Sequence, residues 1–180
     1  MSRIGAVVLA AGDASRFGAP KQRLLLPDVL ERLRAAPVDE IVVVAGAYRL
    51  ELPSDTVSLG VSARVVDCPE WERGPGASLR CGLLALAAET EGAVVVLADG
   101  PDLAPAAVAR VLDVWHEGGA VVVAASYGNV RGHPIVVGRA AWGDVPDEGL
   151  RERNVKLVPC DDLGAPGDVD TPADLPHRLR

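Results

Sequence analysis

The chain has 180 residues and a mass of 18.7 kDa, which suits one compact domain spanning residues 1–180. Apolar residues make up 49% of it and aromatic residues only 3%, so Val, Leu and Ala must fill the core. The 25 acidic and 18 basic residues give a net charge of −7. This charge argues against binding to nucleic acid or to an anionic membrane surface, but it permits one small anionic ligand at a local positive site.

The cysteines and the N-terminal apolar run bear on the cellular compartment. Cys68, Cys81 and Cys160 form no CxxC pair, and no His stands at a metal-ligand spacing from any of them. We therefore expect reduced thiols in a cytoplasmic protein, with neither a disulfide scaffold nor a zinc site. The apolar run 4–11 follows a single Arg and precedes a Gly-rich loop, which favours a buried first strand over a signal peptide.

Short apolar runs rich in β-branched residues recur along the chain and predict strands. Because they do not alternate with polar residues, they are typical of a parallel sheet that is covered on both faces. They lie at 5–10, 40–45, 63–67, 93–98 and 120–125, and shorter ones follow at 133–137 and 155–159.

Helical patterns separate these strands at 29–36, 78–89 and 105–117, and a closing helix is expected over 172–179 with Asp170 or Thr171 as its cap. Alternation of this kind predicts an α/β fold, a Rossmann-like three-layer sandwich with a mostly parallel sheet.

The loop after the first strand, Gly12 to Gln22, is rich in glycine and carries two cations, Arg16 and Lys21. A glycine-rich turn after the first parallel strand is a common phosphate site, because its backbone N–H groups point into the turn. The loop matches neither the dinucleotide pattern GxGxxG nor the Walker pattern GxxxxGK[ST]. Both a phosphate site and a purely structural turn with surface bases remain open on these residues alone.

Two carboxylates are candidate ligands for Mg²⁺. Asp99 directly follows the strand expected at 93–98, and Asp170 lies in the run Asp-Val-Asp-Thr-Pro, which we also place at a strand end. Mg²⁺ that bridges phosphates usually takes one or two protein carboxylates, although helix capping explains either Asp equally well. Ser78 is first a candidate helix cap and second a donor to a nucleotide, and His133 is more simply structural than functional.

Five segments in a fixed order resemble the MobA-like nucleotidyltransferase family, and within it the molybdenum cofactor cytidylyltransferases. The first loop resembles the family signature LAAGxSxRFGxxK, and the later segments resemble GxSLRxGL, ADQP or ADMP, GHP and DVDTPADL. These segments lie at 9–21, 76–83, 98–101, 132–134 and 168–175.

The resemblance implies the nucleotide-diphospho-sugar transferase type of fold and Mg²⁺-dependent transfer of a nucleoside monophosphate, with release of pyrophosphate. It implies CTP as the donor and a phosphorylated acceptor such as molybdopterin, with a molybdoenzyme as a further partner. By position, Arg16 and Lys21 hold the triphosphate and Asp99 and Asp170 bind Mg²⁺. The nucleoside-binding positions are Leu9, Ala10, Ala11, Gly12, Asp67 and Ser78.

Three other functions stay open at this level. Some proteins of this family are assigned to nicotine blue reduction with NAD(P)H, and the missing GxGxxG argues against that activity here. A second alternative is a non-catalytic nucleotide-binding accessory protein for molybdoenzymes. A sugar-nucleotide transferase is suggested only by the Asp-Val-Asp run at 168–170.

Overall fold

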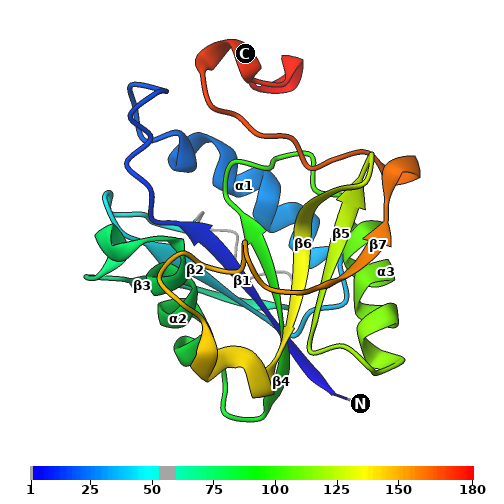
Figure 1. Ribbon diagram of the computed structural model, residues 1–180. Coiled ribbons are helices and arrows are strands. Elements are labelled where there is room, and N and C mark those ends of the chain that lie inside the picture. The colour runs from blue at the N-terminus through cyan, green and yellow to red at the C-terminus, as the bar shows by residue number, and fades with distance from the viewer. Residues whose placement is uncertain (1, 53–59) are drawn as a thin grey trace.

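The computed structural model describes residues 2–52 and 60–180, and within them one seven-stranded sheet carries the fold (Figure 1). Its strands, in spatial order, are β3 (Ser62–Asp67), β2 (Glu40–Ala45), β1 (Arg3–Ala10), β4 (Thr90–Leu97), β6 (Val130–Gly138), β5 (Val122–Tyr127) and β7 (Lys156–Pro159).

The sheet is parallel except at one strand. β3, β2, β1 and β4 pair in parallel, and so do β5 and β7. β6 is inserted between β4 and β5 and runs antiparallel to both. The expected mostly parallel sheet is confirmed, and the apolar pattern of β6 did not reveal its reversed direction.

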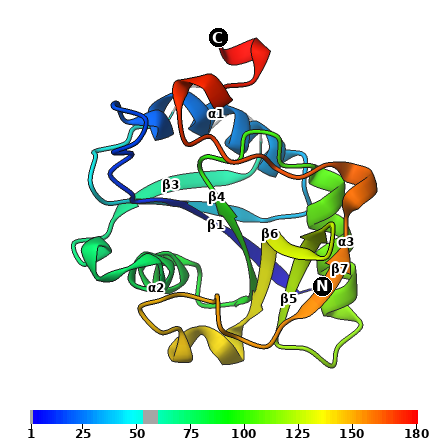
Figure 2. The same cartoon turned by 45° about the horizontal axis from the view of Figure 1, so that its top comes forward.

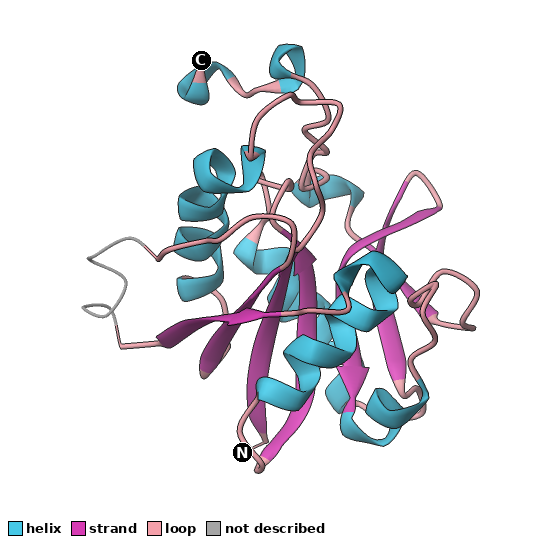
Figure 3. Ribbon diagram, turned by 90° about the vertical axis from the view of Figure 1, so that its left-hand side faces the viewer, coloured by secondary structure: helices cyan, strands magenta, loops and turns pink. Residues whose placement is uncertain are grey.

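Helices cover both faces of the sheet, which gives three layers (Figures 2 and 3). α1 (Lys21–Arg34) and α3 (Pro105–His116) pack on one face, where Leu30 and Val111 join a core that contains Val8. α2 (Pro75–Ala85) and the 3-10 segment η3 (Arg139–Asp144) cover the other face, where Leu83 packs against Val7. Because neighbouring strand residues point to opposite faces, Val7 and Val8 serve two separate cores. The three-layer α/β prediction is confirmed.

Three predicted helices differ from the observed ones. α2 runs over Pro75–Ala85 and not over 78–89, and α1 and the closing helix differ more. α1 begins at Lys21, well before the expected start at residue 29, and continues through Pro27. Proline usually interrupts a helix, but the buried Leu25, Leu26 and Val29 keep this segment packed on the sheet.

The prediction of a closing helix over 172–179 is wrong. Two short 3-10 turns, Pro172–Asp174 and His177–Leu179, form there instead, with Pro176 between them. Thr171 is the cap of the first turn, through a capping box with Asp174.

The expectation of reduced thiols is wrong for Cys68 and Cys81, which form a disulfide with their Cα atoms 5.9 Å apart. Cys68 follows β3 and Cys81 lies on α2, so the chain crossing from strand to helix brings the two thiols together. Cys160 is a free, buried cysteine. The disulfide removes the support that three reduced thiols gave to a cytoplasmic location.

Within the ranges described, no helix has the length and apolar character needed to cross a membrane.

Candidate functional site

The glycine-rich loop lies at the carboxyl end of β1, where it lines a cavity of about 230 Å³ that we call the loop cavity. The amide of Gln22 donates to the carbonyl oxygen of Gly12 at 2.7 Å, and the hydroxyl of Tyr48 donates to that of Asp13 at 2.6 Å. These bonds fix the loop from its two sides. A Cβ placed on Gly12 would meet no heavy atom of the described protein within 4 Å, so packing does not require glycine there.

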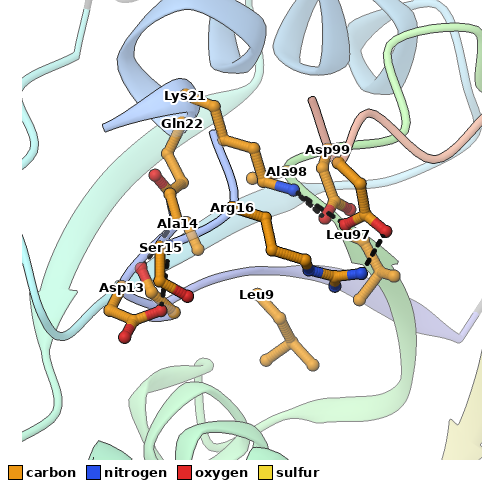
Figure 4. A pocket seen from close by; sticks show the side chains of 13 residues that line it. Leu9, Asp13, Ala14, Ser15, Arg16, Lys21, Gln22, Leu97, Ala98 and Asp99 are labelled. Carbon is orange, nitrogen blue, oxygen red and sulfur yellow. Dashed lines mark hydrogen bonds and ion pairs between the residues drawn. The ribbon is translucent and has the colours of Figure 1, made fainter. Parts of the chain in front are cut away.

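Lys21 lines the loop cavity, and its side chain points toward Asp99 (Figure 4). It is only 8% exposed, although it is the first residue of α1. Its Nζ lies 3.0 Å from Oδ2 of Asp99 and 3.6 Å from Oδ1 of Asp170, and it donates to the carbonyl oxygen of Val169 at 2.5 Å. Arg16 adds a second cation, with Nη1 2.6 Å from Oδ2 of Asp170. Lys21 therefore contacts both predicted carboxylates, and Arg16 contacts Asp170.

Asp170 reaches this place from a loop, and its expected position at a strand end is wrong, because β7 ends at Pro159. The loop before Asp170 is docked on the turn that follows β4. The backbone N–H of Asp102 donates to Pro166 at 2.9 Å, and that of Val169 donates to Asp99 at 3.1 Å. A Cβ on Gly100 would come within 3.2 Å of Pro166, so glycine allows the close approach of the two segments.

The electrostatics of the site favour a bound cation. Burial raises the pKa of Asp168, and the neighbouring charges of Asp99 and Asp170 raise it further. Oδ1 of Asp99 is buried and accepts no hydrogen bond from any described residue. Residues 2–52 and 60–180 hold no cluster of three or more metal-ligating side chains. Two carboxylates with an unused buried oxygen fit Mg²⁺, which completes its coordination with water and phosphate oxygens.

Two further cavities adjoin the loop cavity, and Leu9 and Leu97 line all three. One, of about 400 Å³, lies between the first loop and the start of α2 and is lined by Ala11, Gly12 and the buried Ser78. Ser78 is not the helix cap, because α2 begins earlier, at Pro75. Two further candidates for nucleotide binding, Ala10 and Asp67, differ in their position relative to these cavities. Ala10 lines the loop cavity, whereas Asp67 is exposed at the end of the edge strand β3 and lines none of the three.

The third cavity, of about 410 Å³, is mainly apolar, and we call it the apolar cavity. Its outer wall is the segment 148–151. Arg80 of α2 holds that wall, because its guanidinium bonds the carbonyl of Val145 at 2.7 Å and the carboxylate of Asp147 at 2.5 Å. The hydrogen bond from Arg80 lowers the pKa of Asp147. The sequence pattern predicts no separate role for Arg80, which lies within the segment 76–83.

His133 on β6 lines the apolar cavity. Its pKa is lowered to about 4, chiefly by burial and also by the charge of Arg131, while the charge of Asp99 opposes the shift. The imidazole is therefore neutral at pH 7. The predicted structural role fits the bond that its carbonyl oxygen accepts from the hydroxyl of Tyr127 at 3.0 Å.

Comparison with known proteins decides the family. A family model described as the MobA-like NTP transferase domain matches residues 6–158. The chain belongs to the MobA-like NTP transferase family. This membership confirms the resemblance drawn from the five motifs, and it gives the protein the nucleotidyltransferase class of its family. The matched range holds Lys21 and Asp99 and ends before Asp170.

Several solved structures share this fold over nearly the whole chain. Rv0371c from Mycobacterium tuberculosis H37Rv is 30% identical with a TM-score of 0.76, and 96% of each chain is covered. Its complex with manganese gives 25% identity and a TM-score of 0.70, also with 96% of each chain covered. A nucleotidyl transferase from Methanothermobacter thermautotrophicus, Mth528, is 22% identical with a TM-score of 0.73, and the match covers 97% of this chain and 94% of that one. No curated protein sequence matches.

Proposed function

We propose that this MobA-like protein transfers cytidine monophosphate from CTP to a small phosphorylated acceptor such as molybdopterin and releases pyrophosphate. One observation carries the proposal: Nζ of Lys21, at the glycine-rich loop, contacts the carboxylates of both Asp99 and Asp170. A cation and two carboxylates at the end of a parallel strand suit a triphosphate with its metal.

Asp99 and Asp170 would hold Mg²⁺. The unpaired buried oxygen of Asp99 supports this, and so does the manganese complex of Rv0371c. When bound, the metal would neutralise negative charge on the triphosphate and on the leaving pyrophosphate. In the structure the ammonium of Lys21 supplies positive charge to both carboxylates. Nucleotide and metal would therefore redirect Lys21 from the carboxylates toward phosphate oxygens.

The residues of the chain then position the two reactants and stabilise charge. A phosphate oxygen of the acceptor attacks the α-phosphorus of CTP, and the bond from that phosphorus to the β-phosphate oxygen breaks. Pyrophosphate leaves with the electron pair, so no protein base has to remove a proton from the anionic nucleophile. Lys21, Arg16 and the backbone N–H groups of the loop bind the phosphates and hold the reacting atoms in line.

The donor is assigned to CTP from the Ala10-Ala11-Gly12 sequence, since cytidylyl transfer goes with Ala-Ala-Gly in the resembling proteins. The cavity between Gly12 and Ser78 is the place for the nucleoside, because it adjoins the loop cavity and is lined by Ala11 and a buried hydroxyl. Asp67 receives no role, because its side chain is exposed away from these cavities.

Calorimetric titration tests the donor and the site. With Mg²⁺ present, CTP should bind more tightly than GTP, ATP or UTP, and chelation of the metal should weaken its binding. Lys21→Ala should lower CTP affinity by about a hundredfold, since it removes a buried charge-assisted contact. Lys156→Ala is the matched control, because Lys156 is the other lysine of the chain and is exposed on β7. Equal CTP binding by the parent and the Lys21 variant, or no binding of any nucleotide, would overturn the proposal.

A further inference from the structure

The chain returns to the candidate site after Asp170, in a stretch that we call the C-terminal segment, residues 171–180. Its two 3-10 turns, Pro172–Asp174 and His177–Leu179, lie over α1 (Figures 1 and 2). The family model matches residues 6–158 and so ends before this segment begins. What the segment contributes to the site therefore has to be read from its own contacts.

Arg178 fastens the C-terminal segment to two other parts of the protein. Its Nε lies 2.9 Å from Oδ2 of Asp28 on α1. Its Nη1 lies 2.8 Å from Oδ1 of Asp102, and its Nη2 donates to the carbonyl oxygen of Pro101 at 3.1 Å, both in the turn that follows β4. Each nitrogen of the guanidinium thus has a partner. Because the group is planar and holds its donors in fixed directions, it fixes these partners relative to one another.

Each part of the chain that Arg178 joins also carries one member of the cation site, which we define as Lys21, Asp99 and Asp170. α1 begins at Lys21, about two helical turns before Asp28. The turn that follows β4 contains Asp99, and the C-terminal segment directly follows Asp170. One guanidinium therefore links the three elements whose side chains form the cation site.

The loop that carries Asp170 is held on both of its sides. Before Asp170, the backbone N–H of the buried Val169 donates to the carbonyl oxygen of Asp99 at 3.1 Å. After Asp170, the contacts of Arg178 anchor the C-terminal segment. The side chain of Arg178 is 43% exposed, and ion pairs at such exposure add little to the stability of a whole fold. The arrangement instead suits the local task of fixing one loop.

We infer that Arg178 is a positioning residue: by joining the C-terminal segment to α1 and to the turn that follows β4, it holds Asp170 where this carboxylate binds a divalent cation together with Asp99. The inference rests on the proposed function, which assigns both carboxylates to the metal. It deepens that function, because it adds a residue that contacts neither the metal ligands nor the nucleotide cavities and acts through the position of Asp170.

The first test measures Mn²⁺ binding to the full chain by electron paramagnetic resonance of the free ion. Arg178→Gln should lower the affinity by about tenfold or more, the loss typical when a group that orients a metal ligand is removed. Loss of a positive charge alone would raise Mn²⁺ affinity, so the direction of the change separates positioning from electrostatics. Arg180→Gln is the matched control and should bind Mn²⁺ like the parent, because Arg180 donates to Ala173 and Leu175 within its own segment.

Amide hydrogen exchange of the metal-free protein gives a second readout that needs neither metal nor activity. The N–H of Val169 should exchange at least about tenfold faster in Arg178→Gln, because the loop that it fixes opens more often. Amides of the buried strand β2 should keep their rates, and the melting temperature should fall by at most about 4 °C, which shows that the variant folds.

The two readouts distinguish this inference from the proposed function. Mn²⁺ affinity equal to that of the parent, or unchanged exchange of Val169, in Arg178→Gln overturns the inference even when the parent binds Mn²⁺ and CTP. A parent protein that binds no Mn²⁺ overturns the metal site of the proposed function. Faster exchange of Val169 in the variant would then still support Arg178 as the residue that holds the loop.

Discussion

The ammonium nitrogen of Lys21 lies 3.0 Å from a carboxylate oxygen of Asp99, and the same nitrogen reaches Asp170 at 3.6 Å. In this state the lysine stands where a divalent cation would also be attracted. The protein thus balances its own carboxylates with an internal charge, and a metal at the proposed site would have to compete with that charge.

Replacing Lys21 with methionine should therefore raise Mn²⁺ affinity in the nucleotide-free protein by about tenfold, because it removes the competing cation and keeps a similar volume. Electron paramagnetic resonance of free Mn²⁺ measures this binding directly. Lys156→Met should leave the affinity unchanged, because Lys156 is exposed and makes no ion pair with any described residue. If the Lys21 variant bound Mn²⁺ no better than the parent, the two carboxylates would not be the metal site.

Gly12→Ala should lower nucleotide affinity while leaving the stability of the fold nearly unchanged. The added methyl group meets no described protein atom within 4 Å, so the free energy of unfolding should stay within about 1 kcal/mol of the parent. The same methyl group points into space that the nucleotide would occupy, and CTP affinity should fall by about tenfold or more. Urea unfolding and calorimetry measure the two effects. Gly143→Ala, at another glycine with open space, should change neither, and a stable variant with normal CTP affinity would place the nucleotide elsewhere.

His133 should make stability depend on pH. Its pKa falls from 6.5 to about 4 on folding, chiefly through burial, so between these values the unfolded chain binds a proton that the folded protein does not. The contribution is present in full above pH 6.5 and is lost as the pH falls toward 4, by up to about 3 kcal/mol. Urea unfolding of the parent and of His133→Gln across this range isolates the effect. Parallel stability curves for the two proteins would show that the histidine is not buried as a neutral group.

The disulfide between Cys68 and Cys81 should show in a count of reactive thiols. Denatured protein that has not been reduced should expose one thiol, that of Cys160, and reduced protein should expose three. Cys81→Ser should lower the free energy of unfolding of the oxidised protein by about 3 kcal/mol, the value expected for a loop of this size. A count of three thiols before reduction would show that the bond is absent from the purified protein.

Much of the fold could be predicted because its determinants are local. Buried strands such as β2 are continuous apolar runs, and the alternation with helices is enough for an α/β sandwich. The direction of β6 could not be predicted, because an apolar run reads the same in a parallel and an antiparallel strand. The start of α1 at Lys21 could not be predicted, because a helix rarely continues through a proline such as Pro27, and here packing of Leu26 and Leu30 on the sheet holds the helix together.

The same distinction applies to the candidate site: features set by the local sequence could be predicted, and contacts between distant segments could not. Lys21 and Asp99 could be predicted, since each lies next to a strand end or a glycine-rich loop. The contact of Asp170 with Lys21 depends on the docking of a distant loop by bonds such as Val169 to Asp99, which no spacing in the sequence reveals. The disulfide has the same origin, because α2 brings Cys81 beside the end of β3.

The docking of Asp170 after the last strand also separates the candidate site from the sheet. All seven strands end by Pro159, whereas the carboxylate pair is completed by a later loop that binds beside Asp99 through the backbone bond from Val169. A change in this loop that breaks that bond should therefore displace Asp170 and leave every strand in place. The sheet and the carboxylate pair can vary independently, because different parts of the chain build them.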